Sequence, residues 1–131
     1  MANRVATILG IGFLLVGILG FVMPALLGAH LTLAHNIVHL VSGAISLWIG
    51  LKGSPSAAKT FCLVFGAVYL LLGIVGFALG TGSDRMFTVL PGQLMFGTVD
   101  HLIHIALGAI FLVGAFMTRA VITPATAGRT A

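Results

Sequence analysis

The sequence predicts an all-α fold, a transmembrane bundle of four helices built from two tandem helical hairpins. Of the 131 residues, 60% are hydrophobic and only 6% are charged, whereas about a quarter of the residues of a soluble domain carry a charge. The apolar residues gather in long runs, and roughly 20 such residues in a helix cross the ~30 Å hydrocarbon core of a bilayer. The order of the runs and their motifs also repeats once along the chain.

The first span is predicted over residues 5–23. A signal peptide is the alternative, since a charged start precedes the apolar run and residues 27–29 form a weak cleavage site. We reject that alternative because residues 10–21 align without gaps on residues 66–77, with seven of twelve positions identical. A removable leader is not expected to resemble an internal helix.

The second span is predicted over residues 31–51 and the third over residues 61–79. Between them, residues 52–59 contain two lysines, a glycine and a proline, a composition typical of a turn. The polar turn therefore joins the two predicted hairpins.

The fourth span is predicted over residues 94–118, after a loop with a short interfacial segment at residues 86–90. Small residues, a proline and a glycine fill residues 119–131, which predicts a mobile tail. Residues 1–118 then form one membrane domain with repeats at 5–51 and 61–118. Because each repeat crosses the membrane twice, a pseudo-two-fold axis along the membrane normal can relate them.

The basic residues predict the orientation of the bundle. If four helices cross, only Arg85 falls on one side of the membrane. The other five fall on the opposite side: Arg4, Lys52, Lys59, Arg119 and Arg129. The positive-inside rule then predicts a multi-pass protein of the cell membrane with both termini, and the tail, in the cytoplasm. Such scattered charges form no basic stripe, so nucleic-acid binding is not expected.

Small residues recur every seven positions in the predicted helices. Seven residues return a helix to nearly the same face, and small residues let membrane helices approach closely. We interpret the stripes as helix-packing surfaces, with a cleft for a flat ligand as the alternative. The positions are Gly10 and Gly17, Gly43 and Gly50, Gly66, Gly73 and Gly80, and Gly108 with Ala115.

A polar motif opens the second helix of each repeat. The alignment of the repeats equates His39 with His104 and His35 with Asp100, and the members of each motif lie four residues apart, on one helix face. From the predicted cytoplasmic helix ends, His39 and His104 both lie about 18–20 Å into the bilayer, in its outer half. We expect both to face the bundle interior, because a polar side chain facing lipid is costly.

Four interpretations of these polar residues remain open. In the first, they form a satisfied network that fixes the helix register: Asp100 bonds one imidazole, and Asn36 and Ser42 bond others. In the second, three histidine nitrogens and a carboxylate hold zinc or copper. That metal set consists of His35, His39, Asp100 and His104.

In the third interpretation, the histidines are axial ligands of a tetrapyrrole. His39 and His104 together would bind haem iron, or one of them the magnesium of a pigment. Gly43 and Gly108, one turn below, would leave room for the ring. The fourth is a proton path or a polar ligand.

Other polar and aromatic residues are expected to have simpler roles. His30 lies in a predicted loop and is expected to be solvated. Tyr69 and Trp48 are expected to pack or to contact lipid. No nucleophile stands beside a base, no Glu is present, and Asp100 is the one carboxylate within a predicted span. We therefore predict that the protein is not an enzyme.

Two short motifs carry a family resemblance: Asn36-x-x-His39-x-x-x-Gly43 and Asp100-x-x-x-His104-x-x-x-Gly108. With them, nearly the whole chain resembles a family of small bacterial four-helix membrane proteins known only as a domain of unknown function. The resemblance implies a fold and a location, and no activity. His101 stands where the repeat alignment places Asn36, so the halves differ at that position.

Together these features predict a non-enzymatic integral membrane protein in contact with the lipid bilayer. We expect it to be an accessory subunit of a larger membrane complex or a homo-oligomer. The alternative is a metal-, haem- or pigment-binding membrane protein that acts in electron transfer.

Cysteine labelling tests the predicted orientation. In a Cys62→Ala background, a cysteine at Ser54 should be shielded from an impermeant thiol reagent added outside intact cells, and a cysteine at Ser83 should be labelled. The reverse pattern would contradict the prediction that both termini are cytoplasmic.

Overall fold

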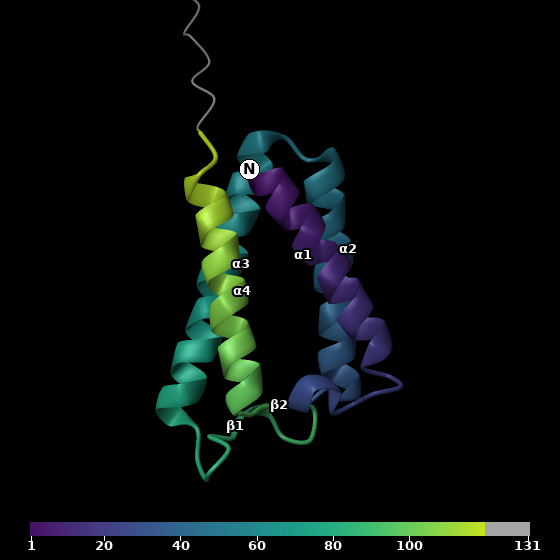
Figure 1. Cartoon of the computed structure of the whole chain (residues 1–131), viewed down its shortest axis with the longest axis vertical. Helices are drawn as coiled ribbons and strands as arrows, with labels where there is room; N and C mark the ends of the chain where they lie inside the picture. Colours follow the sequence, from purple (N-terminus) through teal and green to yellow (C-terminus); the bar gives the residue numbers. More distant parts are fainter. Residues whose placement is uncertain (120–131) are drawn as a thin grey trace, which may run out of the picture.

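The computed structural model describes residues 1–119, so most of the predicted tail, residues 120–131, lies outside the described residues. The predicted all-α bundle is confirmed (Figure 1). The described elements are α1 (Ala2–Leu19), η1 (Leu26–Gly28), α2 (Leu33–Lys52), α3 (Pro55–Leu79), β1 (Phe87–Leu90), β2 (Leu94–Phe96) and α4 (Thr98–Phe116). Four of these helices are long and apolar enough to cross a membrane.

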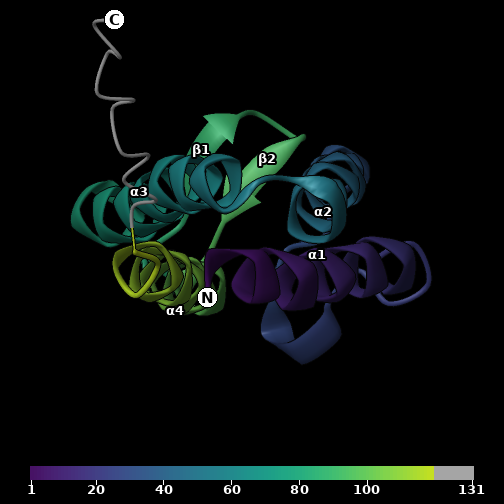
Figure 2. The ribbon, with the colours of Figure 1, turned by 90° about the horizontal axis from the view of Figure 1, so that it is seen from above.

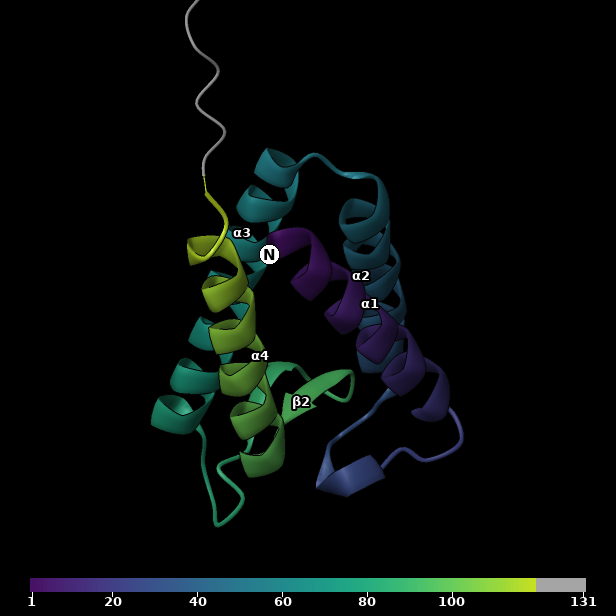
Figure 3. The same ribbon diagram turned by 45° about the horizontal axis from the view of Figure 1, so that its top comes forward.

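The helices pack as two hairpins, α1 against α2 and α3 against α4, and the hairpins meet each other less extensively. Figure 2 shows the two pairs from above. The hairpins lie close together at the end that holds the N-terminus and separate toward the other end (Figures 1 and 3). Small buried residues, among them Ala2, Ala6 and Ala58, allow the close approach at the first end.

Contacts between the chain ends close this end of the bundle. The backbone N–H of Ala2 donates to the Thr118 hydroxyl at 2.7 Å, and the Lys59 ammonium donates to the Thr118 carbonyl at 3.0 Å. The α2–α3 turn lies at the same end, whereas η1 and the two strands lie at the other, which we call the loop end (Figure 1). The described termini and the lysine-containing turn therefore share one end.

All four helix starts differ from the sequence-based prediction: α1 begins three residues early and α2 two residues late, and the larger differences are in α3 and α4. Helix α3 begins at Pro55, six residues early, because the Ser54 hydroxyl accepts a hydrogen bond from the Ala57 N–H at 3.1 Å. Serine is a favoured N-cap, and proline suits the first helical turn. Part of the segment that the sequence predicts as a turn, residues 52–59, therefore forms the N-cap and the first turn of α3.

The loop before α4 also differs. Residues 87–90 and 94–96 pair as an antiparallel hairpin, with Phe87 opposite Phe96, where the sequence predicts an interfacial segment and a helix start. Helix α4 therefore begins only at Thr98. This small hairpin covers the loop end between α2 and α3 (Figure 2).

The glycine stripes hold each hairpin together. In the first hairpin, a Cβ at Gly10 would lie 2.6 Å from the Leu47 nitrogen, and one at Gly43 would lie 2.9 Å from the Leu14 nitrogen. Real Cβ atoms are not found that close to a backbone atom. The interpretation of these stripes as packing surfaces is confirmed.

The second hairpin makes the same contacts at the aligned positions. A Cβ at Gly66 would lie 2.7 Å from the Leu112 side chain, and one at Gly108 would lie 2.5 Å from the Leu70 nitrogen. The repeat alignment equates these four positions with those of the first hairpin. The correspondence supports the predicted duplication, which itself stays a prediction.

Candidate functional site

Asp100 anchors the loop end of the site. It lies in the first turn of α4 and is 2% exposed. Its carboxylate accepts the Gly97 N–H at 2.9 Å and the His30 N–H at 3.2 Å, and it lies 2.8 Å from the His30 Nδ1. A negative charge is stabilised at a helix N-terminus, where the backbone N–H groups are unpaired.

His30 is a partner of Asp100, a contact that the sequence did not predict, although its ring is also partly solvated, as expected. Its side chain is 32% exposed and lies between two carboxylates, with Nε2 at 3.7 Å from Asp84. The reason is the path of the loop after η1, which brings His30 to the start of α4. No local pattern in the sequence indicates this contact across 70 positions.

His35 is held by the same loop. It is 3% exposed, and its Nδ1 lies 2.7 Å from the His30 carbonyl. Because a carbonyl can only accept, Nδ1 carries the proton. The His35 ring centroid is 4.3 Å from that of His39 and 6.1 Å from that of His104.

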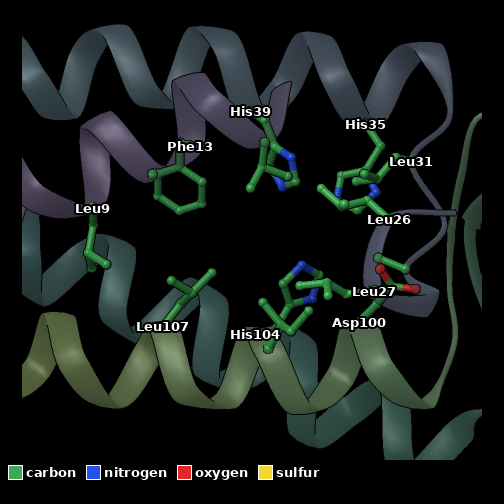
Figure 4. A pocket seen from close by; sticks show the side chains of 14 residues that line it. Leu9, Phe13, Leu26, Leu27, Leu31, His35, His39, Asp100, His104 and Leu107 are labelled. Carbon is green, nitrogen blue, oxygen red and sulfur yellow. The ribbon is translucent and has the colours of Figure 1, made fainter. Parts of the chain in front are cut away.

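His39 and His104 face each other across the interface between the hairpins. They are 7% and 3% exposed, and their side chains point toward one another from α2 and α4, with Asp100 farther toward the loop end (Figure 4). Among residues 1–119, neither buried Nδ1 atom has a hydrogen-bond partner. An unpaired buried polar atom is rare in folded proteins and calls for an explanation.

Aromatic rings support both imidazoles. The Phe13 centroid lies 5.6 Å from His39, and the Tyr69 centroid lies 5.4 Å from His104. Phe13 and Tyr69, which occupy aligned positions, stack on each other at 5.3 Å. Phe96, from β2, lies 5.0 Å from His104. Tyr69 thus packs in the core, one of its two expected roles.

Two cavities lie between the hairpins, and His35, His39 and His104 line both. The first cavity, about 180 Å³, lies between α1 and α4 (Figure 4). The second cavity, about 320 Å³, lies between α2 and α3. Residues of η1 close the loop end of the first, and residues of the strand hairpin close that of the second. The imidazoles form the wall that the cavities share.

The linings of the two cavities correspond in the repeat alignment. Each cavity is formed by the first helix of one hairpin and the second helix of the other. The first cavity is lined by Leu9, Gly12, Phe13 and Val16 of α1 and by Ile103 and Leu107 of α4. The aligned positions line the second: Phe65, Val68, Tyr69 and Leu72 of α3, and Val38 and Ser42 of α2.

The predicted metal set stays a prediction. Within residues 1–119, no group of three or more His, Cys, Asp or Glu side chains is placed to hold a metal ion. The Asp100 carboxylate accepts two backbone N–H groups, which hold it at the loop end, farther along the bundle than the imidazoles of His39 and His104 (Figure 4).

The space expected beside a tetrapyrrole is filled. Gly43 and Gly108, predicted to leave room for the ring, lie against Leu14 and Leu70 of their own hairpins. That part of the prediction is wrong, because these glycines serve helix packing. His39 and His104 do lie together, as a pair of axial ligands would, but with aromatic rings packed on them.

His101 and Asn36 play matching roles that the sequence did not reveal. The Asn36 side chain lies against Gly20 and donates to the Leu31 carbonyl at 3.4 Å. The His101 ring lies against Gly76, with Nε2 at 2.9 Å from the Arg85 carbonyl. Each ties the second helix of its hairpin to a loop. The alignment of Gly20 with Gly76 is the sequence feature that could have indicated this match.

A family model described as a domain of unknown function (DUF4383) matches residues 3–117. No curated protein and no solved structure matches the chain.

Replacing Asp100 by Asn should destabilise the fold. The amide keeps the shape but loses the charge that strengthens the hydrogen bonds from Gly97 and His30, an effect of about 1.5–3 kcal/mol. Unfolding in detergent measures the change. Asp84→Asn is the control, because Asp84 is half exposed, lies 3.7 Å from His30, and accepts the Thr98 N–H at 3.2 Å in an exposed hydrogen bond. Equal stability of the two variants would contradict the anchoring role of Asp100.

Proposed function

The chain belongs to the family described as a domain of unknown function, DUF4383, and because that description names no activity, we propose a function from the site alone. The protein is a non-enzymatic, multi-pass membrane protein that binds a small lipophilic molecule between its hairpins. The polar group of that molecule hydrogen-bonds His39 and His104.

One observation carries this proposal. His39 and His104 line both cavities, are more than nine-tenths buried, and have Nδ1 atoms without a partner among residues 1–119. A buried polar atom left unpaired costs about 1–3 kcal/mol. A bound molecule with a hydrogen-bonding group removes that cost.

The rest of each cavity suits a lipophilic molecule. Most of the lining side chains are aliphatic or aromatic, as in ligand pockets, where a few polar groups orient the ligand. Ile103 lines the first cavity and is 38% exposed; Val68 lines the second and is 49% exposed. Since exposed apolar side chains of the spans contact lipid, both cavities border the bilayer, and the ligand enters sideways from it.

The orientation and assembly of the protein are part of the proposal. The Lys52–Lys59 turn and the described termini share one end of the bundle, and the loop between α3 and β1, which contains Arg85, lies at the other. This distribution supports cytoplasmic termini in the cell membrane and a site in the outer half of the bilayer. The glycine stripes pack the two helices of each hairpin together, so they do not point to a contact with another chain. That the protein is an accessory subunit or a homo-oligomer therefore stays a prediction.

Extraction of the purified protein tests the proposal. Wild-type protein in lipid nanodiscs, extracted with organic solvent and analysed by mass spectrometry, should release one lipophilic molecule in near-equal amount to the protein. The double variant His39→Leu/His104→Leu should not, because leucine cannot hydrogen-bond the polar group.

Trp48→Leu is the matched control, because Trp48 lies on the same helix as His39 and is 64% exposed. It should retain the molecule. An identical extract from wild type and the histidine double variant would contradict the proposal. A visible absorption band or a stoichiometric metal, lost in the same variant, would instead favour the metal or haem alternative.

A further inference from the structure

We infer that the ligand occupies the second cavity and carries an oxygen-bearing ring, of the quinone or phenol kind, on an apolar chain. This inference rests on the proposed function and adds the cavity and the chemical class. It follows from the differences between two cavities that the repeat alignment otherwise equates.

Hydroxyl groups distinguish the second cavity. Ser42 and Tyr69 line it, and the aligned residues of the first cavity are Leu107 and Phe13. The second cavity therefore places two hydroxyls beside the imidazoles that both cavities share. Hydroxyls and imidazoles can donate to the oxygens of a ring.

The carboxylate lies on the other side. Asp100 lines the first cavity and does not line the second. A carboxylate accepts hydrogen bonds only, so it repels a carbonyl oxygen and favours donors or cations. An oxygen acceptor is accordingly better placed in the second cavity.

Aromatic walls suit a flat ring. Phe65, which aligns with Leu9 of the first cavity, lies 6.2 Å from Tyr69 between ring centroids. Phe96 also lines the second cavity, next to His104. Aromatic rings attract one another at centroid separations of about 4.5–7 Å. Besides the shared imidazoles, three aromatic side chains line the second cavity and only Phe13 lines the first, so a ring gains more aromatic contacts in the second cavity.

Size and access agree with this choice. The second cavity measures about 320 Å³ and the first about 180 Å³, and pockets for small molecules begin near ~300 Å³. Val64 and Val68 line the second cavity and are 54% and 49% exposed. An apolar chain on the ring can pass between them into the lipid.

Three probes test the chemical class. Decylbenzoquinone, its hydroquinone and decylbenzene are titrated into protein-containing nanodiscs by calorimetry, with empty nanodiscs subtracted. We expect the two oxygen-bearing rings to bind at least tenfold more tightly than decylbenzene. Equal affinities of all three would overturn the class of ligand.

Three variants test the choice of cavity. Ser42→Leu and Tyr69→Phe introduce residues that the first cavity already has at the aligned positions, and each should weaken binding about tenfold, as expected when a hydrogen bond is lost. Gly12→Val fills the first cavity, with no atom within 4 Å of a Cβ there, and should leave the affinity unchanged. Thermal unfolding confirms that each variant folds.

The outcomes separate the two proposals. If Gly12→Val weakens binding while Tyr69→Phe and Ser42→Leu do not, the ligand lies in the first cavity and the inference falls, whereas the proposed function stands. The same holds if no probe binds but the wild-type extract still contains a histidine-dependent molecule. If probe binding and the extracted molecule are both unchanged in the His39→Leu/His104→Leu variant, the proposed function falls as well.

Discussion

The cost of an unpaired polar group in a membrane interior is the constraint on which this structure depends. Helix formation satisfies the backbone of the spans, but each polar side chain needs its own partner. Asp100, His30 and His35 meet this need at the loop end, where backbone N–H and carbonyl groups are available. His39 and His104 lie deeper, where the helices offer aromatic faces and no partner for Nδ1 within residues 1–119. The site is thus defined by two buried nitrogen atoms that have no hydrogen-bond partner among the described residues.

The packing of the hairpins explains why space exists at that point. Within a hairpin, glycines bring the two backbones into direct contact, as Gly43 and Gly108 do against Leu14 and Leu70. Between hairpins, contact is mainly at the end that holds the N-terminus. Beyond the stacked pair of Phe13 and Tyr69 the hairpins separate, and the cavities open on both sides of the imidazoles. Tight hairpins and a loose interface therefore leave space for the proposed binding site in a small bundle.

The sequence predicted the parts of the fold that depend on periodic patterns. Hydropathy gave the four helices, and the spacing of Gly10, Gly43 and Gly66 gave their packing faces. The alignment of the two repeats also paired His39 with His104. The rest depends on contacts between distant positions: the loop that carries His30 to Asp100 spans 70 positions, and the strand hairpin forms through the pairing of Phe87 with Phe96. No local pattern encodes such contacts, so the direction of the Asp100 carboxylate and its pairing with His30 required the structure.

Nuclear magnetic resonance of the protein with ¹⁵N-labelled histidines, in bilayers of one defined phospholipid, tests the central claim most directly. The chain has five histidines, so the ring signals can be assigned by single substitutions. Adding lipid extracted from the native cell membrane supplies the ligand. We expect the ring signals of His39 and His104 to shift together, while that of His30, which is engaged with Asp100, stays unchanged. Unchanged signals of His39 and His104, or equal shifts of all five, would contradict a ligand site between the hairpins.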